Sequence, residues 1–185
     1  MNHRNNRRSE ATRNKIKQSL IEMLHEQPLG KITVQALCEL ASINRSTFYN
    51  HYDSPESVLK NIETDFSSGL ERHMEGYYTM ENSIESLTNM LTRILEYMQI
   101  NQDICFLLQT PSLEPIFRRN VFRNIFKSCL FSHPVFEKYT GDSLVYMQTF
   151  LLYGCGHCID RWIRCGYEES PAKLASIIAG FIMKF

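Results

Sequence analysis

Residues 32–53 read ITVQALCELASINRSTFYNHYD, and the same helix-start pattern occurs twice within this stretch. In each copy an apolar residue precedes a helix-capping residue, and a second apolar residue follows the cap one turn later. The two copies are Ile32, Thr33 and Leu37, and then Ile43, Asn44 and Phe48. A capping side chain accepts a hydrogen bond from a free backbone N–H, and the apolar pair packs as a hydrophobic staple. The pattern predicts two short helices, over about 34–41 and about 45–52.

The segment between the two predicted helices runs only from Ala41 to Ile43. Helices joined so tightly must cross steeply, and Leu37, Phe48 and Tyr52 are available to pack against a preceding helix. We therefore expect a helix-turn-helix. Such a pair of helices can also be purely structural, so a helical interaction adapter that does not bind DNA remains an alternative.

The surface of the second helix favours DNA. Once its apolar face is set aside, it is left with side chains that donate or accept hydrogen bonds, namely Arg45, Ser46, Thr47, Tyr49, Asn50 and His51. No acidic residue occurs from Leu40 to Tyr52. A solvated helix would normally carry Asp or Glu, which DNA phosphates would repel. We expect this helix to read DNA.

Charge is distributed unevenly along the chain, although the net charge is zero. Residues 1–60 hold nine Lys or Arg and six Asp or Glu, whereas residues 61–185 hold eleven and fourteen. The basic excess is steepest before residue 18, where six Lys or Arg face only Glu10. This segment is typical of an anion-binding arm, but solvated basic tails have the same composition.

Composition is that of an ordinary globular protein, with 43% apolar and 22% charged residues. No apolar stretch follows the basic start, so a signal peptide is not expected. The longest uncharged run, residues 143–159, is too short and too polar for a membrane span. The six cysteines lack disulfide-framework spacing. We expect a soluble, cytoplasmic protein with reduced thiols and no membrane association.

Apolar residues recur with helical spacing in almost every segment, which predicts an all-α chain. A first helix is expected from near Ser9 to Pro28, and a fourth from Ser54–Pro55 to about residue 75. Further helices are expected near 82–100, 102–109, 113–131, 142–165 and 170–184. The predicted division is a basic arm and helix-turn-helix domain over 1–53 and a helical ligand-binding and dimerisation domain over 54–185.

The segment from Thr12 to Leu59 resembles the TetR family of bacterial transcriptional regulators. The resemblance is carried by ITV at 32–34, ASIN at 41–44 and STFYNHY at 46–52. Near the other end, Trp162–Ile163, Gly166 and Ser170–Pro171 resemble the ligand-domain ending of some Gram-positive members. The resemblance implies an Ω-shaped homodimer that binds a near-palindromic double-stranded operator. It also implies a repressor that an unidentified small-molecule effector releases.

Mapped by position, the resemblance implies DNA contacts from the start and exposed edge of the second helix and from the cap of the first. The predicted set is Thr33, Asn44, Arg45, Ser46, Thr47, Tyr49, Asn50 and His51. Arg45 and Asn50 are the expected sequence readers, because Arg pairs with guanine and Asn with adenine.

Two positions depart from the family pattern. Ser42 stands where many members have Gly, so a left-handed backbone there would be strained. Pro55 replaces a common phosphate-binding Lys, so backbone affinity is expected to depend more on the N-terminal arginines or on Lys60.

The second part of the chain leaves two alternatives open at each of its features. Its aromatic side chains either line an effector pocket or fill the core; those assigned to the pocket are Phe106, Phe117, Phe122, Tyr146, Phe150 and Tyr153. The last two helices are apolar almost all round, and either form a four-helix dimer interface or fill the subunit core. Gly154, Gly156 and Gly180 would allow close approach of backbones.

Cys155–Gly156–His157–Cys158 has the spacing of redox and metal sites. No strand precedes it and no second ligand pair is evident, so cysteines that pack a crowded helix explain it more simply. A redox- or metal-responsive regulator stays open as an alternative. The sequence has no Gly-rich phosphate loop, nucleophile elbow or carboxylate cluster. We therefore expect no enzyme activity, cofactor or metal.

Overall fold

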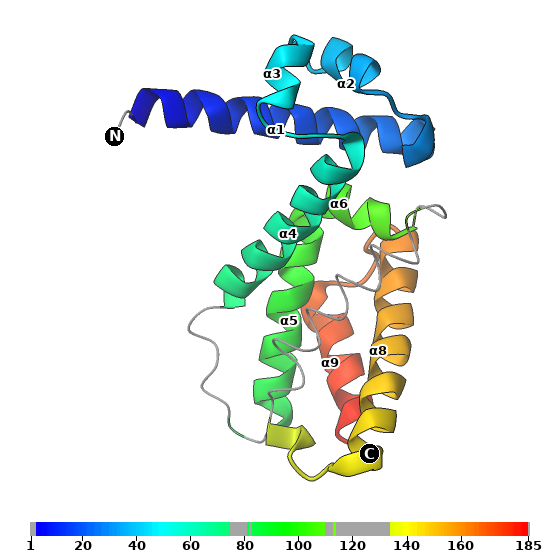
Figure 1. The fold of residues 1–185 in the computed structure, drawn as a ribbon. Coiled ribbons are helices and arrows are strands. Elements are labelled where there is room, and N and C mark those ends of the chain that lie inside the picture. The colour runs from blue at the N-terminus through cyan, green and yellow to red at the C-terminus, as the bar shows by residue number, and fades with distance from the viewer. Residues whose placement is uncertain (1–2, 75–80, 82, 110–112, 114–133, 185) are drawn as a thin grey trace.

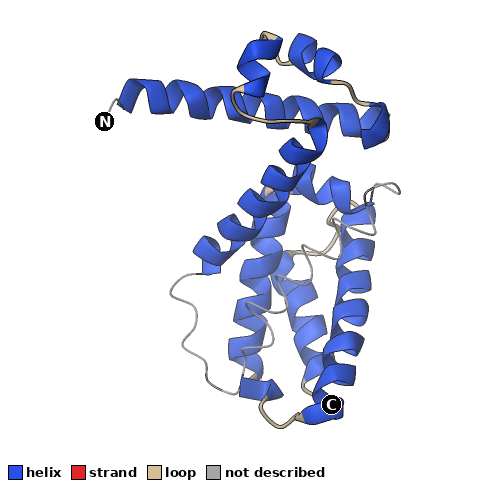
Figure 2. Cartoon of the chain, viewed as in Figure 1, coloured by secondary structure: helices blue, strands red, loops and turns tan. Residues whose placement is uncertain are grey.

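The computed structural model describes residues 3–74, 81, 83–109, 113 and 134–184, and every regular element among these residues is helical (Figure 2). The α-helices are α1 (His3–Glu26), α2 (Val34–Leu40), α3 (Arg45–Tyr49), α4 (Pro55–Met74), α5 (Ile84–Ile100), α6 (Gln102–Phe106), α8 (Gly141–Arg164) and α9 (Pro171–Ile182). Short 3-10 turns are η1 (Leu29–Lys31), η2 (Leu107–Gln109) and η4 (Pro134–Phe136). The all-α prediction is confirmed, and the helix predicted near 113–131 lies outside the described residues.

Helices α1, α2 and α3 form a small unit at one end of the molecule (Figure 1). Long α1 passes beneath the short pair α2 and α3, and contacts α2 directly. Fully buried Ile16 and Leu20 of α1 meet Leu37 of α2 and Phe48 of α3 in one hydrophobic core. Burial of these side chains holds α3 against the unit, so only its other edge is left for solvent.

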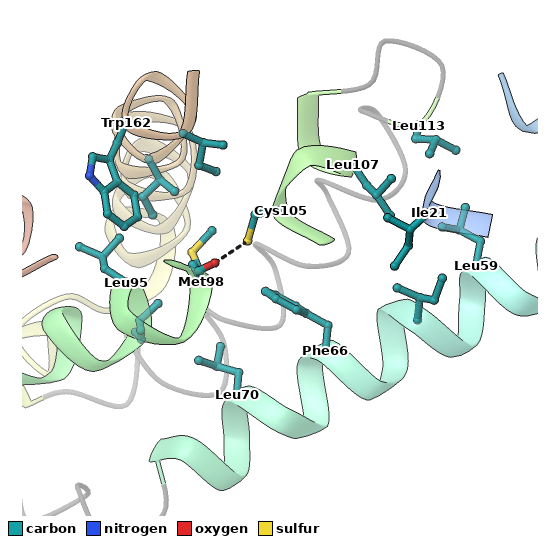
Figure 3. Close-up of a cluster of buried hydrophobic side chains, with 14 of the residues drawn as sticks. Ile21, Leu59, Phe66, Leu70, Leu95, Met98, Cys105, Leu107, Leu113 and Trp162 are labelled. Carbon is teal, nitrogen blue, oxygen red and sulfur yellow. Dashed lines mark hydrogen bonds between the residues drawn. The ribbon is translucent and has the colours of Figure 1, made fainter. Parts of the chain in front are cut away.

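Helix α4 connects this unit to the rest of the chain. Its first half packs on α1, where Leu59 lies near Ile21, and its second half packs on α5, where Phe66 and Leu70 face Met98 (Figure 3). The apolar core is therefore continuous from the helix-turn-helix into the bundle. A displacement of α4 must disturb both parts, because interiors are close-packed.

Tyr97 of α5 fixes the contact between α4 and α5. Its hydroxyl donates a hydrogen bond to the carbonyl of Phe66 over 3.1 Å, and the two rings pack 5.2 Å apart. Gly69 makes this approach possible, because a Cβ at residue 69 would overlap the Tyr97 hydroxyl.

Helices α5, α8 and α9 stand side by side as the remaining bundle, with the most extensive packing between α5 and α9 (Figure 1). Gly166 and Tyr167 follow α8 with φ angles of 67° and 61°, and this left-handed pair turns the chain toward α9. The indole of Trp162 donates to the carbonyl of Glu169 over 2.7 Å and closes the turn. No helix in the described part of the chain has the length and hydropathy needed to cross a bilayer.

Two helix boundaries differ from prediction. Helix α1 begins at His3 rather than near Ser9, because the polar residues before Ser9 include neither Pro nor Gly to stop it. Helix α3 ends at Tyr49 rather than near residue 52, because the N–H of His51 bonds to the Phe48 carbonyl at 2.8 Å and tightens the last turn. The domain division after residue 53 stays a prediction.

Candidate nucleic-acid interface

The turn between α2 and α3 has the geometry of a Schellman motif. Ser42 lies in the left-handed region with φ 53°, its N–H bonds to the Glu39 carbonyl at 3.2 Å, and the Ile43 N–H bonds to the Cys38 carbonyl at 2.9 Å. Ser42 therefore adopts the left-handed conformation that the sequence comparison marked as costly for a serine. A left-handed non-glycine residue costs about 1–2 kcal/mol, and this backbone conformation turns the chain from α2 into α3.

The two predicted helix starts differ in their caps. The hydroxyl oxygen of Thr33 accepts from the Ala36 N–H at 3.1 Å, as predicted. Asn44 occupies the equivalent position with an extended backbone, but its side chain makes no capping bond to the described residues, so that part of the prediction is wrong. The first helical hydrogen bond still forms, because the Asn44 carbonyl accepts from the Phe48 N–H at 3.0 Å. The Asn44 amide is exposed and stays available to a partner.

The polar edge of α3 is open to solvent. Arg45, Ser46 and Asn50 are exposed, the Tyr49 side chain is 56% exposed, and Thr47 and His51 are partly buried. Phe48, between them in sequence, is 0% exposed. The edge is thus free to enter a groove of DNA, while Phe48 anchors the helix from behind. Contact of these residues with DNA stays a prediction.

Arg45 is joined to α2 by side chains that the sequence reasoning missed. Its Nη2 donates to the Oε1 atom of Gln35 at 2.6 Å, and the Gln35 Nε2 donates to a carboxylate oxygen of Glu39 at 3.0 Å. The missed signal is positional: Gln35 is the second residue of α2 and faces the start of α3.

A polar groove of about 680 Å³ separates the first turns of α1 from the helix-turn-helix. Its lining includes Arg8 of α1 on one side and Glu39, Asn44, Thr47 and His51 on the other. The basic first turns of α1 extend past α2 and α3 (Figure 1) and so continue the polar edge of α3. This position is consistent with an arm that binds an anion.

A chain of polar contacts ties the end of the helix-turn-helix to α4 and α1. The Tyr52 hydroxyl donates to the Oδ1 atom of Asn61 at 2.7 Å, and the Asn61 amide donates to Asp65 at 3.3 Å. The other Asp65 oxygen accepts from Lys17 of α1 at 2.7 Å. Burial raises the pKa of the Tyr52 phenol, so it remains a hydrogen-bond donor at neutral pH. The link joins all three elements at the root of α4.

The predicted effector-binding aromatics that the structure describes lie on two different helices, α6 and α8. Phe106 stacks on His25 of α1, with ring centroids 3.9 Å apart. Tyr146, Phe150 and Tyr153 are instead 75%, 55% and 62% exposed on one face of α8. Phe117 and Phe122 lie outside the described residues. The effector pocket stays a prediction.

The exposed face of α8 continues onto α9. Between the two helices lies an apolar groove of about 240 Å³, whose lining includes Phe150, Gly154, Cys158, Ile178 and Phe181. A Cβ added at Gly154 or Gly180 would meet no described atom within 4 Å. Among the described residues, therefore, no side chain or backbone fills the space beside these two glycines, and close approach of a partner backbone there stays a prediction.

The cysteine pair on α8 is placed for packing. Cys155 is buried, and burial with the neighbouring Cys158 raises its pKa to about 12. It is therefore protonated near neutral pH, whereas thiol reactivity and metal binding need the thiolate. Among the described residues, no three His, Cys, Asp or Glu side chains form a group that could hold a metal ion. The burial and the raised pKa of Cys155 favour a packing role for that thiol.

Residues 85–184 match the family model TetR_C_8, which describes a transcriptional regulator C-terminal region. No curated protein matches the chain. The crystal structure of a TetR transcriptional regulator from Streptococcus agalactiae 2603V is similar over 96% of this chain and 97% of that one, at 26% identity and a TM-score of 0.65.

Two more distant structures share the fold. The dihydroxyacetone kinase operon activator DhaS covers 94% of each chain at 20% identity with a TM-score of 0.63. The fatty acid degradation regulator FadR from Bacillus halodurans covers 93% of this chain and 94% of its own at 10% identity with a TM-score of 0.66. The family model covers more than half of the chain. In this chain the matching bundle is preceded by a helix-turn-helix with an exposed polar edge. The chain belongs to the TetR family of transcriptional regulators, which are not enzymes.

Proposed function

We propose that this chain is a homodimeric, sequence-specific DNA-binding repressor that a small-molecule effector releases from its operator. One observation carries the proposal: α3 presents an acid-free polar edge to solvent while Phe48 fixes its opposite side in the core. An adapter that binds only protein has no physical need for such an edge. A surface without carboxylates avoids phosphate repulsion.

In the proposed complex, α3 lies in the major groove. Arg45 and Asn50 read base edges from exposed positions, and Arg can pair bidentately with guanine and Asn with adenine. Thr47 and His51, which line the groove beside α1 together with Arg8, contact the DNA phosphates, and so does Thr33 at the start of α2. The first set gives sequence preference, and the second gives affinity that falls with salt.

The proposed dimer forms through α8 and α9. Their exposed side chains form an apolar face of Val145, Tyr146, Phe150, Tyr153, Ile177 and Phe181. A large apolar patch on a regulator is typical of a protein interface, and the open space beside Gly154 and Gly180 allows a partner helix to approach closely. A two-fold axis would set two α3 helices about one DNA turn, roughly 34 Å, apart.

Release would act through α4. This helix touches α1 at one end and α5 at the other, and the Tyr52–Asn61–Asp65 link attaches it to the end of the helix-turn-helix. An effector that converts 99% binding-competent chain into 1% must prefer the released state by about 5.5 kcal/mol.

Selection of bound sequences from random DNA by the full chain tests the proposal. We expect an enriched, near-palindromic site, because a symmetric dimer reads two equal half-sites. Recovery of unrelated sequences would exclude sequence-specific binding and favour the adapter. A promoter fusion carrying the selected site then measures the sign of regulation, which is worth testing because DhaS is described as an activator.

A further inference from the structure

The surface shared by α2 and α3 carries three polar side chains bonded in series. Arg45 donates to Gln35 at 2.6 Å, and Gln35 donates to Glu39 at 3.0 Å. We propose that Gln35 is a positioning residue that holds Arg45 ready to read a base, and that Glu39 sets the orientation of the Gln35 amide. The inference rests on the proposed function, since it assigns a role within DNA reading.

The orientation of the Gln35 amide follows from hydrogen-bonding chemistry. An ionised carboxylate only accepts, so Glu39 takes the NH₂ end of the amide and leaves the carbonyl oxygen toward Arg45. A flipped amide would present NH₂ to a guanidinium that has no acceptor. Glu39 and Arg45 therefore select the same orientation, and the series is consistent from end to end.

The bond from Arg45 leaves the guanidinium able to read a base. Arginine has five N–H donors, and Gln35 accepts from only one nitrogen, so donors remain for the two acceptors on the guanine edge. A long side chain that is ordered before binding loses less freedom on binding. This pre-ordering raises affinity by about three- to tenfold.

The role of these side chains in folding is small. All three residues are exposed, and exposed polar pairs contribute little to stability. Their substitution should leave the helix-turn-helix folded, so effects on DNA binding can be measured cleanly. Circular dichroism and the thermal midpoint of each variant verify this.

The main test is a double-mutant cycle in the full chain, with the duplex selected by the wild-type chain and a scrambled duplex as probes. Gln35→Met keeps the side-chain length and removes the acceptor. We expect a three- to tenfold loss for the selected duplex, little change for the scrambled one, and less than a twofold effect of Gln35→Met when Arg45→Ala is already present. An unchanged or tighter Gln35→Met complex overturns the inference, as does a loss that persists without Arg45.

A matched pair at Glu39 separates positioning from charge. Glu39→Gln retains an acceptor for the Gln35 amide, whereas Glu39→Ala removes it, and both remove the negative charge. We expect only Glu39→Ala to weaken the preference at the base that Arg45→Ala relaxes. Equal effects of the two variants would exclude the role of Glu39.

The outcomes also separate this inference from the function on which it rests. If the wild-type chain selects no sequence, both fail. The wild-type chain can instead select a site whose binding is weakened by Arg45→Ala and not by Gln35→Met. The proposed DNA-binding function is then supported, and only the positioning role of Gln35 fails.

Discussion

The α1–α3 unit and the α8–α9 pair expose side chains of opposite polarity. Both have apolar cores, but the first exposes Arg45, Ser46 and Asn50, whereas the second exposes Tyr146, Phe150 and Tyr153. A polar edge free of acids suits a polyanion, and an apolar face suits another protein surface. The comparison teaches that the side chains left outside, rather than overall composition, indicate the class of partner.

The largest effect is expected from removing the side chain that anchors α3 in the core. Phe48→Ala deletes a fully buried ring, and we expect a loss of about 3–5 kcal/mol in the free energy of unfolding, because a cavity remains. Urea unfolding measures it. The neighbouring Tyr49→Ala, at a 56% exposed position, should change stability by only about 0.5 kcal/mol or less. Equal losses would mean that the two edges of α3 are not distinct.

A charge on the other surface should break the dimer. Tyr153→Asp places a carboxylate in the proposed interface, and we expect association to weaken by about 2–4 kcal/mol, because the charge must be desolvated. Sedimentation velocity measures the monomer fraction. Asn89→Asp, on the exposed side of α5, is the control and should leave the dimer intact. A dimeric Tyr153→Asp chain would move the interface elsewhere.

The joint between the two regions is tested at Gly69. Gly69→Ala should reduce the free energy of unfolding by about 1–3 kcal/mol, because the new methyl group overlaps the Tyr97 hydroxyl. Adding Tyr97→Phe removes that oxygen and should recover part of the loss in chemical denaturation. A Gly69→Ala chain as stable as the wild type would contradict the close contact between α4 and α5.

Arg45→Ala tests the role of the polar edge of α3 in reading DNA sequence. We expect specific binding to weaken by about 1–3 kcal/mol, with relaxed preference at one base position. Neutralising Arg7 and Arg8 should instead weaken all sequences alike and lower the salt dependence. Fluorescence anisotropy over a salt series distinguishes them. If Arg45→Ala affects selected and random DNA equally, Arg45 does not read sequence.

The smallest expected effect concerns the strained turn. Ser42→Gly should raise the free energy of unfolding by about 1 kcal/mol, because glycine adopts a φ of 53° without steric cost. Thermal unfolding detects this change, and Ser42→Ala, which keeps the Cβ, should not show it. Destabilisation by Ser42→Gly would mean that the serine side chain has a role of its own.

The local features of the helix-turn-helix were predictable because they depend on near neighbours. The Thr33 cap and the start of α4 at Pro55 each follow from a few adjacent residues. The missed features join distant positions. Gln35 meets Arg45 across the turn, and sequence periodicity carries no information on which side chains meet across it.

The aromatics show a second limit. One aromatic side chain, Phe106, lies against α1, whereas another, Tyr146, lies toward solvent. Hydrophobic spacing identifies an apolar face, but it does not say whether that face is covered within the subunit or by a second copy. The fold class was therefore predictable, whereas the effector pocket stays a prediction.

Helix α4 packs against two helices, against α1 through Leu59 and against α5 through Phe66. If an effector weakens the hold on DNA through this helix, thermodynamic linkage requires the converse in equal measure. Operator binding must then lower the affinity for the effector by the same factor. A DNA-bound regulator would bind the effector more weakly than a free one. As the effector concentration rises, free molecules would therefore be occupied first.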